Sequence, residues 1–333
     1  MEPIIEVKNL KTSFMTGNGE VQAVRGVSFQ VGKGEILGIV GESGSGKSVT
    51  SMSILRLLAD TAVIKEGEIL FDGNDLTKVS KKEMQKIRGE QISMIFQDPM
   101  SSLNPLITVG KQVSEMIREH HKEISKEQAK QQVLELFARV RIPEPEKRYN
   151  AYPHEFSGGM RQRVMIAMAL ANKPKLLIAD EPTTALDVTI QDQILKQLRG
   201  LQKDSETSIM FITHDLGVVA ELCERVIVMY GGLIMEEAPI DDIFENPKHP
   251  YTLGLLASIP GLDKDKSQRL NPIPGSPPDM TNPPKGCPFA PRCPYARRIC
   301  AQQCPEYVAV DEHHRSMCWL LQPDAPDEMN PFR

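Results

Sequence analysis

The chain has 333 residues, of which 40% are hydrophobic and 25% charged, and its formal net charge is −5. At about 150 residues per domain this length predicts about two domains, and the charged fraction argues against bulk disorder. The acidic balance lacks the basic footprint of a dedicated nucleic-acid binder. No apolar run approaches the about 18 residues that span a bilayer, and the N-terminus resembles no signal peptide. We therefore expect the chain to stay in the cytosol.

Three strands and a helix are predicted in the first part of the chain. Apolar residues predict short strands over residues 4–10 and 21–31. The nearly continuous apolar run at residues 35–40 is typical of a buried strand in a parallel sheet. A Gly- and Ser-rich turn follows this run, and residues 48–58 then have a helical pattern.

Strands and helices keep alternating farther along the chain. The apolar runs at residues 176–179 and 209–213 each precede a polar residue and then a helical pattern. Residues 103–140 differ, since they are charged and helical in period and carry no strand signal. The alternation predicts an α/β layered fold into which residues 103–140 are inserted as helix.

Residues 41–48 match the P-loop pattern in full, with an apolar strand before them and a helix after them. Glycines in such a loop let backbone N–H groups surround phosphate oxygens at the positive end of the helix. Lys47 is predicted to reach the β- and γ-phosphates, and the Ser48 hydroxyl to bind Mg²⁺. The alternative is a glycine-rich turn without a ligand. The predicted nucleotide contacts here are Gly41, Ser43, Gly44, Ser45, Gly46, Lys47, Ser48 and Val49.

Two acidic residues follow the apolar run at residues 176–179. Mg²⁺ at a P-loop needs a second protein contact at the end of a neighbouring strand, and Asp180 supplies one. Glu181 is placed to polarise an attacking water as general base. The alternative is a helix N-terminus whose acidic residues favour the helix dipole.

Residues 157–159, Ser-Gly-Gly, open an apolar-periodic helix that runs through Ala171. A hydroxyl, glycine N–H groups and a positive helix end make a second anion site; an ordinary serine N-cap with glycine packing is the alternative. With this helix start the chain resembles the ATP-binding subunits of ABC transporters over roughly residues 4–250. Two such subunits meet head to tail and sandwich two nucleotides. The residues that would contact the ATP of the second subunit are Ser157, Gly158 and Gly159.

The resemblance implies further site residues. Gln97 resembles the Q-loop glutamine, which contacts metal and water, and residues 185–187 resemble the D-loop, in which Asp187 contributes to the nucleotide site. His214 resembles the switch histidine that touches the γ-phosphate, although a histidine after a strand is also commonly structural. Phe14 resembles the aromatic residue that stacks on adenine, with core packing as its alternative. The Mg²⁺ ligands implied are Ser48, Gln97 and Asp180.

The family resemblance also implies the domain organisation. It implies a P-loop NTPase (RecA-like) ABC cassette over residues 1–246, with a helical subdomain at about residues 98–168. Met160 after the two glycines is similar to the form in the oligopeptide/dipeptide importer subfamily. The His-Pro-Tyr element at residues 249–251 and the Pro-Gly-Ser-Pro-Pro segment resemble the C-terminal extension of peptide-importer ATPases, which assigns residues 247–333 to that extension.

Five cysteines crowd into this Pro-rich extension, which suggests metal rather than the disulfides of a secreted scaffold. Their spacing is neither the ferredoxin run nor the paired zinc pattern, so iron–sulfur, zinc, reduced thiols or a disulfide stay open. In the resembled family a four-cysteine set holds a [4Fe–4S] cluster in some members; Cys304 looks additional, and Cys223 is expected to be a packing residue. The implied cluster ligands are Cys287, Cys293, Cys300 and Cys318.

Together these features imply an ATPase subunit that binds and hydrolyses Mg-ATP to drive di- or oligopeptide uptake through a membrane permease. The implied partners are a second, related ATPase subunit in a heterodimer, two transmembrane permease chains, contacted near residues 98–105, and an extracytoplasmic peptide-binding protein. Nucleic acid is not among them. The expected location is peripheral, on the cytoplasmic face of the cell membrane.

Alternatives from other classes fit the sequence less well. A related nickel importer has similar ATPase subunits. An ABC ATPase acting on DNA or ribosomes would need a long coiled coil after Gln97 or a second P-loop, and the sequence has neither. A plain P-loop kinase or GTPase leaves residues 157–159 and the cysteine-rich extension unexplained.

Overall fold

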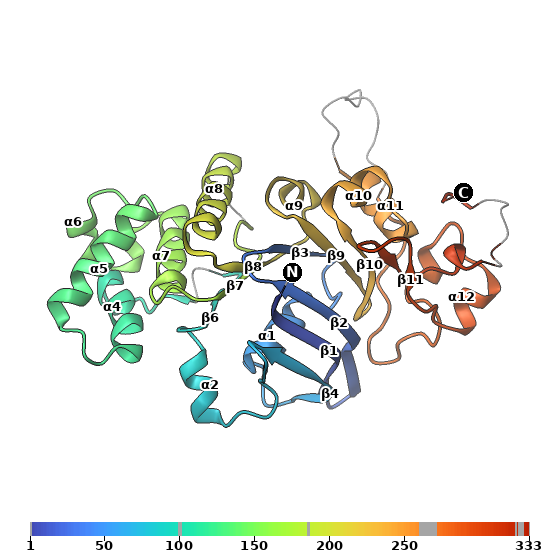
Figure 1. Ribbon diagram of the computed structural model, residues 1–333, viewed down its shortest axis with the longest axis horizontal. Helices are drawn as coiled ribbons and strands as arrows, with labels where there is room; N and C mark the ends of the chain where they lie inside the picture. The colour runs from blue at the N-terminus through green and yellow to red at the C-terminus, as the bar shows by residue number, and fades with distance from the viewer. Residues whose placement is uncertain are drawn as a thin grey trace. The chain divides into compact units, whose positions relative to one another are not determined.

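A computed structural model describes residues 2–98, 102–184, 187–259, 272–323, 325 and 330–332 (Figure 1). The chain divides into two compact units. The P-loop unit comprises residues 5–30, 37–77 and 213–333, and the helical unit comprises residues 1–4, 31–36 and 78–212. No helix among the described residues combines the length and apolarity needed to cross a membrane.

A four-stranded sheet contains most of the N-terminal residues (Figure 1). Its order is β2-β1-β4-β5, and β1 pairs antiparallel with β4. The predicted strands at residues 4–10 and 21–31 are confirmed. Both are longer than their apolar residues suggested, because hydrogen bonding to a neighbouring strand continues beyond those residues. The strand bounds are β1 Pro3–Thr16, β2 Gly19–Gly32, β4 Ala62–Phe71 and β5 Asn74–Asp75.

The second strand array of the P-loop unit has the order β3-β9-β10-β12-β11. Strand β3 pairs parallel with β9, whereas β9, β10, β12 and β11 pair antiparallel in turn. All five residues of β3 are buried, as its continuous apolar run predicts. Gly38 allows close packing there, since a Cβ would lie 2.7 Å from Val219 Cγ1 of α9. The bounds are β3 Ile36–Val40, β9 Arg225–Tyr230, β10 Leu233–Pro239, β11 Val308–Ala309 and β12 Arg315–Ser316.

Short helices complete the P-loop unit. The helix predicted after the glycine-rich turn is α1 (Lys47–Leu55), which ends when Arg56 enters the left-handed region. The remaining helices are α9 Leu216–Leu222, α10 Ile240–Glu245, α11 Pro250–Ala257 and α12 Arg298–Gln302, with single 3₁₀ turns at Ala290–Arg292 and Trp319–Leu321.

The helical unit contains a parallel strand trio with the order β8-β7-β6. The predicted helical insertion at residues 103–140 is two helices, α4 and α5, because the chain turns before Ser125, which caps α5 with a capping box. The strands are β6 Ile92–Ile95, β7 Leu176–Asp180 and β8 Ser208–Thr213. The helices are α2 Lys81–Ile87, α4 Val109–His120, α5 Lys126–Arg139, α6 Pro145–Tyr149, α7 Gly158–Leu170 and α8 Val188–Ser205, with a 3₁₀ turn at Pro153–Glu155.

The cysteine-rich extension is packed into the P-loop unit rather than hanging from it. Strand β12 pairs with β10 through Glu236 and Ser316. The ring of Phe289 meets Tyr230 edge-on at a centroid distance of 5.4 Å and lies 5.2 Å from the ring of Tyr251. The boundary between residues 246 and 247 stays a prediction, since residues on both sides of it belong to one compact unit.

The aromatic cluster around Phe289 is expected to stabilise the extension. Phe289→Ala removes a ring that is 1% exposed, and such truncations cost about 3–5 kcal/mol. Chemical denaturation of the two purified chains measures the loss in free energy of unfolding. The matched control, Phe244→Ala, should lose clearly less, because that ring is already 37% exposed. Equal losses would contradict this account of the cluster.

Candidate functional site

The P-loop connects the end of β3 to the start of α1, and steric limits explain its glycines. Gly41 has φ 153° and Gly46 has φ 101°. A Cβ at Gly41 would lie 2.1 Å from the carbonyl oxygen of Met229, and one at Gly46 would lie 2.6 Å from that of Ala23. Any side chain at either position would collide with backbone that cannot swing aside. The loop therefore needs glycine at both positions in order to close tightly.

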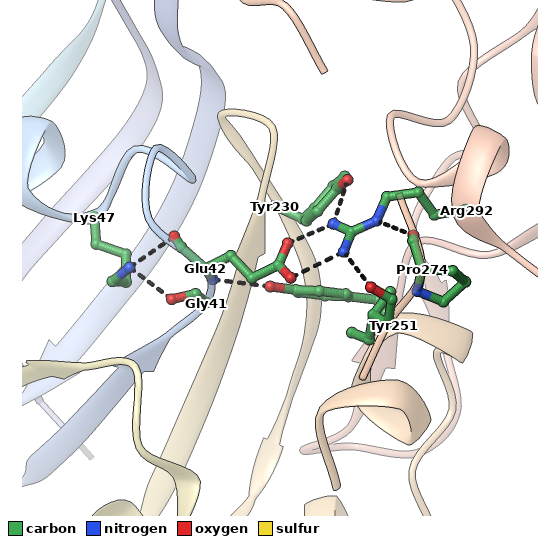
Figure 2. A network of polar contacts seen from close by, with 8 residues as sticks. Gly41, Glu42, Lys47, Tyr230, Tyr251, Pro274 and Arg292 are labelled. Atoms are coloured by element: carbon green, nitrogen blue, oxygen red, sulfur yellow. Dashed lines mark hydrogen bonds and ion pairs between the residues drawn. The ribbon is translucent and has the colours of Figure 1, made fainter. Parts of the chain in front are cut away.

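Lys47 lies across the inside of this loop. Its side chain is buried, and its Nζ donates to the carbonyl oxygens of Gly41 at 2.7 Å and Glu42 at 3.0 Å (Figure 2). Ser45 and Gly46 are also buried, whereas Ser43 and Gly44 are exposed at the crest of the loop. An ammonium held beneath an open backbone loop at a helix start is an arrangement that binds phosphate oxygens. The half-buried Ser48 and Val49 follow in the first turn of α1.

Phe14 lies on β1 opposite Ala62 of β4 and is half-buried. It comes two residues after Thr12, so both side chains leave the strand on the same face. The hydroxyl of Thr12 is 3.0 Å from that of Ser53 in α1. Phe14 is therefore on the strand face that packs toward the P-loop helix, and its stacking on adenine stays a prediction.

The predicted acidic pair lies at the carboxyl end of β7 in the helical unit. Asp180 is buried as the last residue of the strand, and the N–H of Glu181 donates to the carbonyl of Ile212 in β8 at 2.9 Å. Glu181 has φ 48°, which turns its side chain out of the strand line. Parallel strands bring their carboxyl ends to one edge of a sheet, and ligands bind there in open α/β sheets.

Gln97 and Glu181 are 84 positions apart in sequence and are in contact in the structure. The Nε2 of Gln97 donates to Oε2 of Glu181 at 3.0 Å, and the Thr184 hydroxyl donates to the same oxygen at 2.9 Å. Both bonds orient one carboxylate oxygen, as a general base requires. Sequence reasoning missed Thr184; its position three residues after Glu181 was the available signal.

Ser157 and Asp187 begin two helices that pack together. Ser157 caps α7 by accepting from the N–H of Met160 at 3.4 Å, and Asp187 caps α8 by accepting from the N–H of Ile190 at 2.9 Å. Gly159 lets the helix starts approach, since its Cβ would be 3.2 Å from Ile190 Cγ2. Ser157, Gly158 and Asp187 are exposed, so both caps face outward. The D-loop residues 185–186 lie outside the described residues.

His214 belongs to the P-loop unit, comes directly after Thr213, the last residue of β8, and is exposed. The next residue, Asp215, caps α9 by accepting from the N–H of Gly217 at 2.8 Å, and its own N–H donates to the Thr213 hydroxyl at 3.1 Å. These bonds fix the backbone on both sides of His214. Its contact with a γ-phosphate stays a prediction.

The cysteines of the extension come together in space. The Cys287 N–H donates to the Cys300 carbonyl at 2.8 Å. Burial raises the pKa of Cys287 and Cys318 to about 12 and that of Cys293 to about 11, and the thiol of Cys318 also interacts electrostatically with those of Cys287, Cys293 and Cys300. The thiol of Cys304 lies 4.0 Å from Met317 Sδ and also interacts electrostatically with that of Cys287. Cys223 is buried and packs near Gly38, as expected of a packing residue.

Comparison with protein families finds two matches. The model described as ABC transporter matches residues 24–184. The model described as the oligopeptide/dipeptide transporter C-terminal region matches residues 235–300. The two matches together cover the P-loop, the Ser-Gly-Gly helix start and the first three cysteines of the extension.

Relatives and solved structures agree with these matches. The chain is 60% identical to an oligopeptide transport ATP-binding protein of Bacillus subtilis, over 97% of this chain and 90% of that protein. It is 53% identical to a dipeptide transport ATP-binding protein of Lactococcus lactis, over 98% and 93% of the two chains. A dimeric ATP-binding cassette solved in a post-hydrolysis state with ADP and Pi superposes with a TM-score of 0.65 at 30% identity, covering 71% of this chain and 98% of that one.

The contact at Gly41 yields a direct test of the loop. Gly41→Ala places a methyl group against the Met229 carbonyl at 2.1 Å, so the loop must open and binding of Mg-ATP should fall at least about tenfold. Equilibrium binding of a fluorescent ATP analogue measures the change. Gly200→Ala is the control, because its Cβ meets nothing within 4 Å; this variant should bind normally. Normal binding by Gly41→Ala would remove the loop from the nucleotide site.

Proposed function

Since the chain belongs to the ABC transporter family, in its branch of oligopeptide and dipeptide transport ATP-binding proteins, we propose that it is the ATPase subunit that powers a peptide importer. The observation that carries this proposal is the Glu181 carboxylate, oriented by Gln97 and Thr184 in a chain that also contains a closed P-loop. A kinase or GTPase has no use for the Ser-Gly-Gly helix start or for the extension.

The residues divide the work of ATP hydrolysis. Lys47 and the loop N–H groups hold the phosphates, because the buried ammonium exchanges carbonyl partners for phosphate oxygens. Glu181 takes the proton of the attacking water through the oxygen that is not occupied by Gln97 and Thr184, or through Oε2 once those donors turn to the water. His214 senses the γ-phosphate from the end of β8.

The three residues predicted to bind Mg²⁺ carry oxygen atoms of the kinds that this ion prefers. Hard cations prefer carboxylate, hydroxyl and amide oxygens, and Ser48, Asp180 and Gln97 supply one of each. Asp180 is buried at a strand end, which positions its carboxylate rigidly. When bound, Mg²⁺ neutralises charge that develops on the β- and γ-phosphates.

A second ATPase subunit is expected to complete each nucleotide site. Ser157 and Gly158 are exposed at the capped start of α7, where helix N–H groups can bind an anion. We expect this anion to be a phosphate group of a nucleotide that a second subunit holds. Beside it Val188 is 81% exposed immediately after Asp187, and an apolar side chain so exposed is typical of a surface that another subunit covers. We assign this face to a head-to-tail pair with a related subunit.

The pair would dock on two permease chains at the cytoplasmic face of the membrane, with an extracytoplasmic binding protein supplying the peptide. Leu106, which is 84% exposed near the Q-loop, supports a docking role for this part of the helical unit. The proposed contact segment 98–105 includes residues 99–101, outside the described residues. The names of the relatives favour peptides over nickel as the cargo.

The four predicted cluster cysteines fit a metal group by their chemistry. Buried thiols with raised pKa values release their protons only where a cation stabilises the thiolates. Among the described residues, the trio of metal-capable side chains with ligand atoms within 4.8 Å of one another is Asp242, Asp311 and His314, with no cysteine in it. The choice of a [4Fe–4S] cluster rests on the family resemblance, and among the described residues no three of these thiols lie within 4.8 Å of one another. Such a cluster, when bound, crosslinks the extension. Its ligands would be Cys287, Cys293, Cys300 and Cys318.

Glu181→Gln tests the hydrolytic function. The amide keeps the contact with Gln97 or Thr184 but cannot accept a proton, so hydrolysis should fall at least about 100-fold while ATP binding persists. Phosphate release and ATP-dependent dimerisation by size-exclusion chromatography measure the two effects. Glu119→Gln, an exposed change on α4, should leave both unaltered. Hydrolysis by Glu181→Gln at the normal rate would assign the base to another group.

The cluster assignment is tested by composition. Anaerobically purified chain should contain about four irons and four sulfides. Cys300→Ser should lose them, whereas Cys304→Ser and Cys223→Ser should retain them, because those two thiols lie outside the predicted ligand set. Zinc in a colourless protein would overturn the choice of iron–sulfur.

A further inference from the structure

Arg292 is buried in the extension, one position before a predicted cluster cysteine. It ends the 3₁₀ turn at Ala290–Arg292, and its residue is 8% exposed. The N–H of Arg292 donates to the Phe289 carbonyl at 3.0 Å, and that of Cys293 donates to the Ala290 carbonyl at 3.3 Å. The backbone that carries the guanidinium is therefore the same short turn that carries Cys293.

The guanidinium reaches the P-loop. Its Nη1 donates to Oε2 of Glu42 at 2.5 Å and its Nη2 to Oε1 at 3.1 Å, a two-pronged contact that only a planar fork can make (Figure 2). The remaining donors are also used. They bind the Tyr230 hydroxyl at 3.0 Å, the Pro274 carbonyl at 2.8 Å and the Ile273 carbonyl at 3.1 Å.

Glu42 is held at its backbone as well as at its carboxylate. Its N–H donates to the Tyr251 hydroxyl at 2.9 Å, and its carbonyl accepts from Lys47 Nζ at 3.0 Å (Figure 2). Tyr251 comes from α11 of the extension. Glu42, the second residue of the P-loop, is thus hydrogen-bonded to two side chains of the extension, Tyr251 and Arg292. Within the loop it also accepts a hydrogen bond from Lys47.

The ion pair resists separation. The hydrogen bonds that Arg292 donates to Glu42 and Tyr230 raise its pKa above its usual range, against the effect of burial. Removing Glu42 would leave the buried guanidinium of Arg292 without its counter-ion, which is far more costly than losing an exposed pair. The loop start therefore keeps its position for as long as the turn at residues 290–292 keeps its own.

We propose that Arg292 is a positioning residue for nucleotide binding, which holds the P-loop through Glu42 and makes its affinity for Mg-ATP depend on the folding of the cysteine turn. This inference rests on the proposed function. It gives the extension a regulatory role, because unfolding of the cysteine turn releases Glu42 and weakens ATP binding. Preorganisation is the physical basis, because a loop that must be ordered on binding binds more weakly.

Arg292→Gln in the full chain should raise the dissociation constant and KM for Mg-ATP about tenfold, the effect of losing charged hydrogen bonds, with kcat at saturating ATP unchanged. Glu42→Gln should act alike, and the double variant should be no worse than either single one, since all three lack the same contact. Arg292→Lys should recover only part of the affinity. Arg315→Gln, which removes a pair with Glu237 in the same unit, is the control and should bind normally.

The dependence on the cysteine turn has its own test. Cys293→Ser should raise the dissociation constant in the wild-type background and leave it unchanged in the Arg292→Gln background. Equal increases in both backgrounds would overturn the coupling through Arg292. Thermal unfolding of each variant identifies any that fail to fold. If Arg292→Gln is among them, the affinity of Arg292→Lys for Mg-ATP, with the positive charge kept, decides whether Arg292 positions the P-loop.

The two proposals fail in different ways. If the unaltered chain does not bind Mg-ATP, the proposed function is wrong. If the unaltered chain binds Mg-ATP and Arg292→Gln binds it equally well, the proposed function stands and the positioning role of Arg292 is wrong.

Discussion

The tight closure of the loop after β3 is the constraint on which the candidate site depends. Two backbone carbonyls, from Met229 and Ala23, leave room for nothing larger than hydrogen at Gly41 and Gly46. That closure buries Lys47 beneath the loop, where its ammonium donates to the carbonyl oxygens of Gly41 and Glu42. A site built this way binds anions through backbone geometry, so its affinity depends on whatever keeps the backbone in place.

The helical unit positions a carboxylate through backbone conformation and side-chain hydrogen bonds. Its strand trio ends at Asp180, and the left-handed conformation of Glu181 turns a single carboxylate toward Gln97 and Thr184. The outward-facing caps of α7 and α8 lie on helices that Gly159 allows to pack closely. An anion-binding helix start that faces outward is the feature on which the proposed pairing with a second subunit rests.

The extension joins the P-loop to the turn that carries Cys293. Its aromatic residues pack around Tyr230 at the end of β9, and its buried Arg292 forms an ion pair with Glu42 at the start of the P-loop. A Pro-rich segment with few core residues gains much of its order from crosslinks. The cysteine turn and the nucleotide loop are therefore mechanically continuous within the P-loop unit, which is the basis of the regulatory role proposed for Arg292.

The sequence by itself determined the local features. The P-loop, the strand before Asp180 and the Ser157 cap are each encoded in a few adjacent residues, because backbone sterics and strand or helix period act over short distances. Only the tertiary structure decided the long-range partners: Gln97 with Glu181, Tyr251 and Arg292 with Glu42, and β12 with β10. Arg292 carries no local sign of its partner Glu42, since a pair separated by 250 positions is created by packing and not by periodicity.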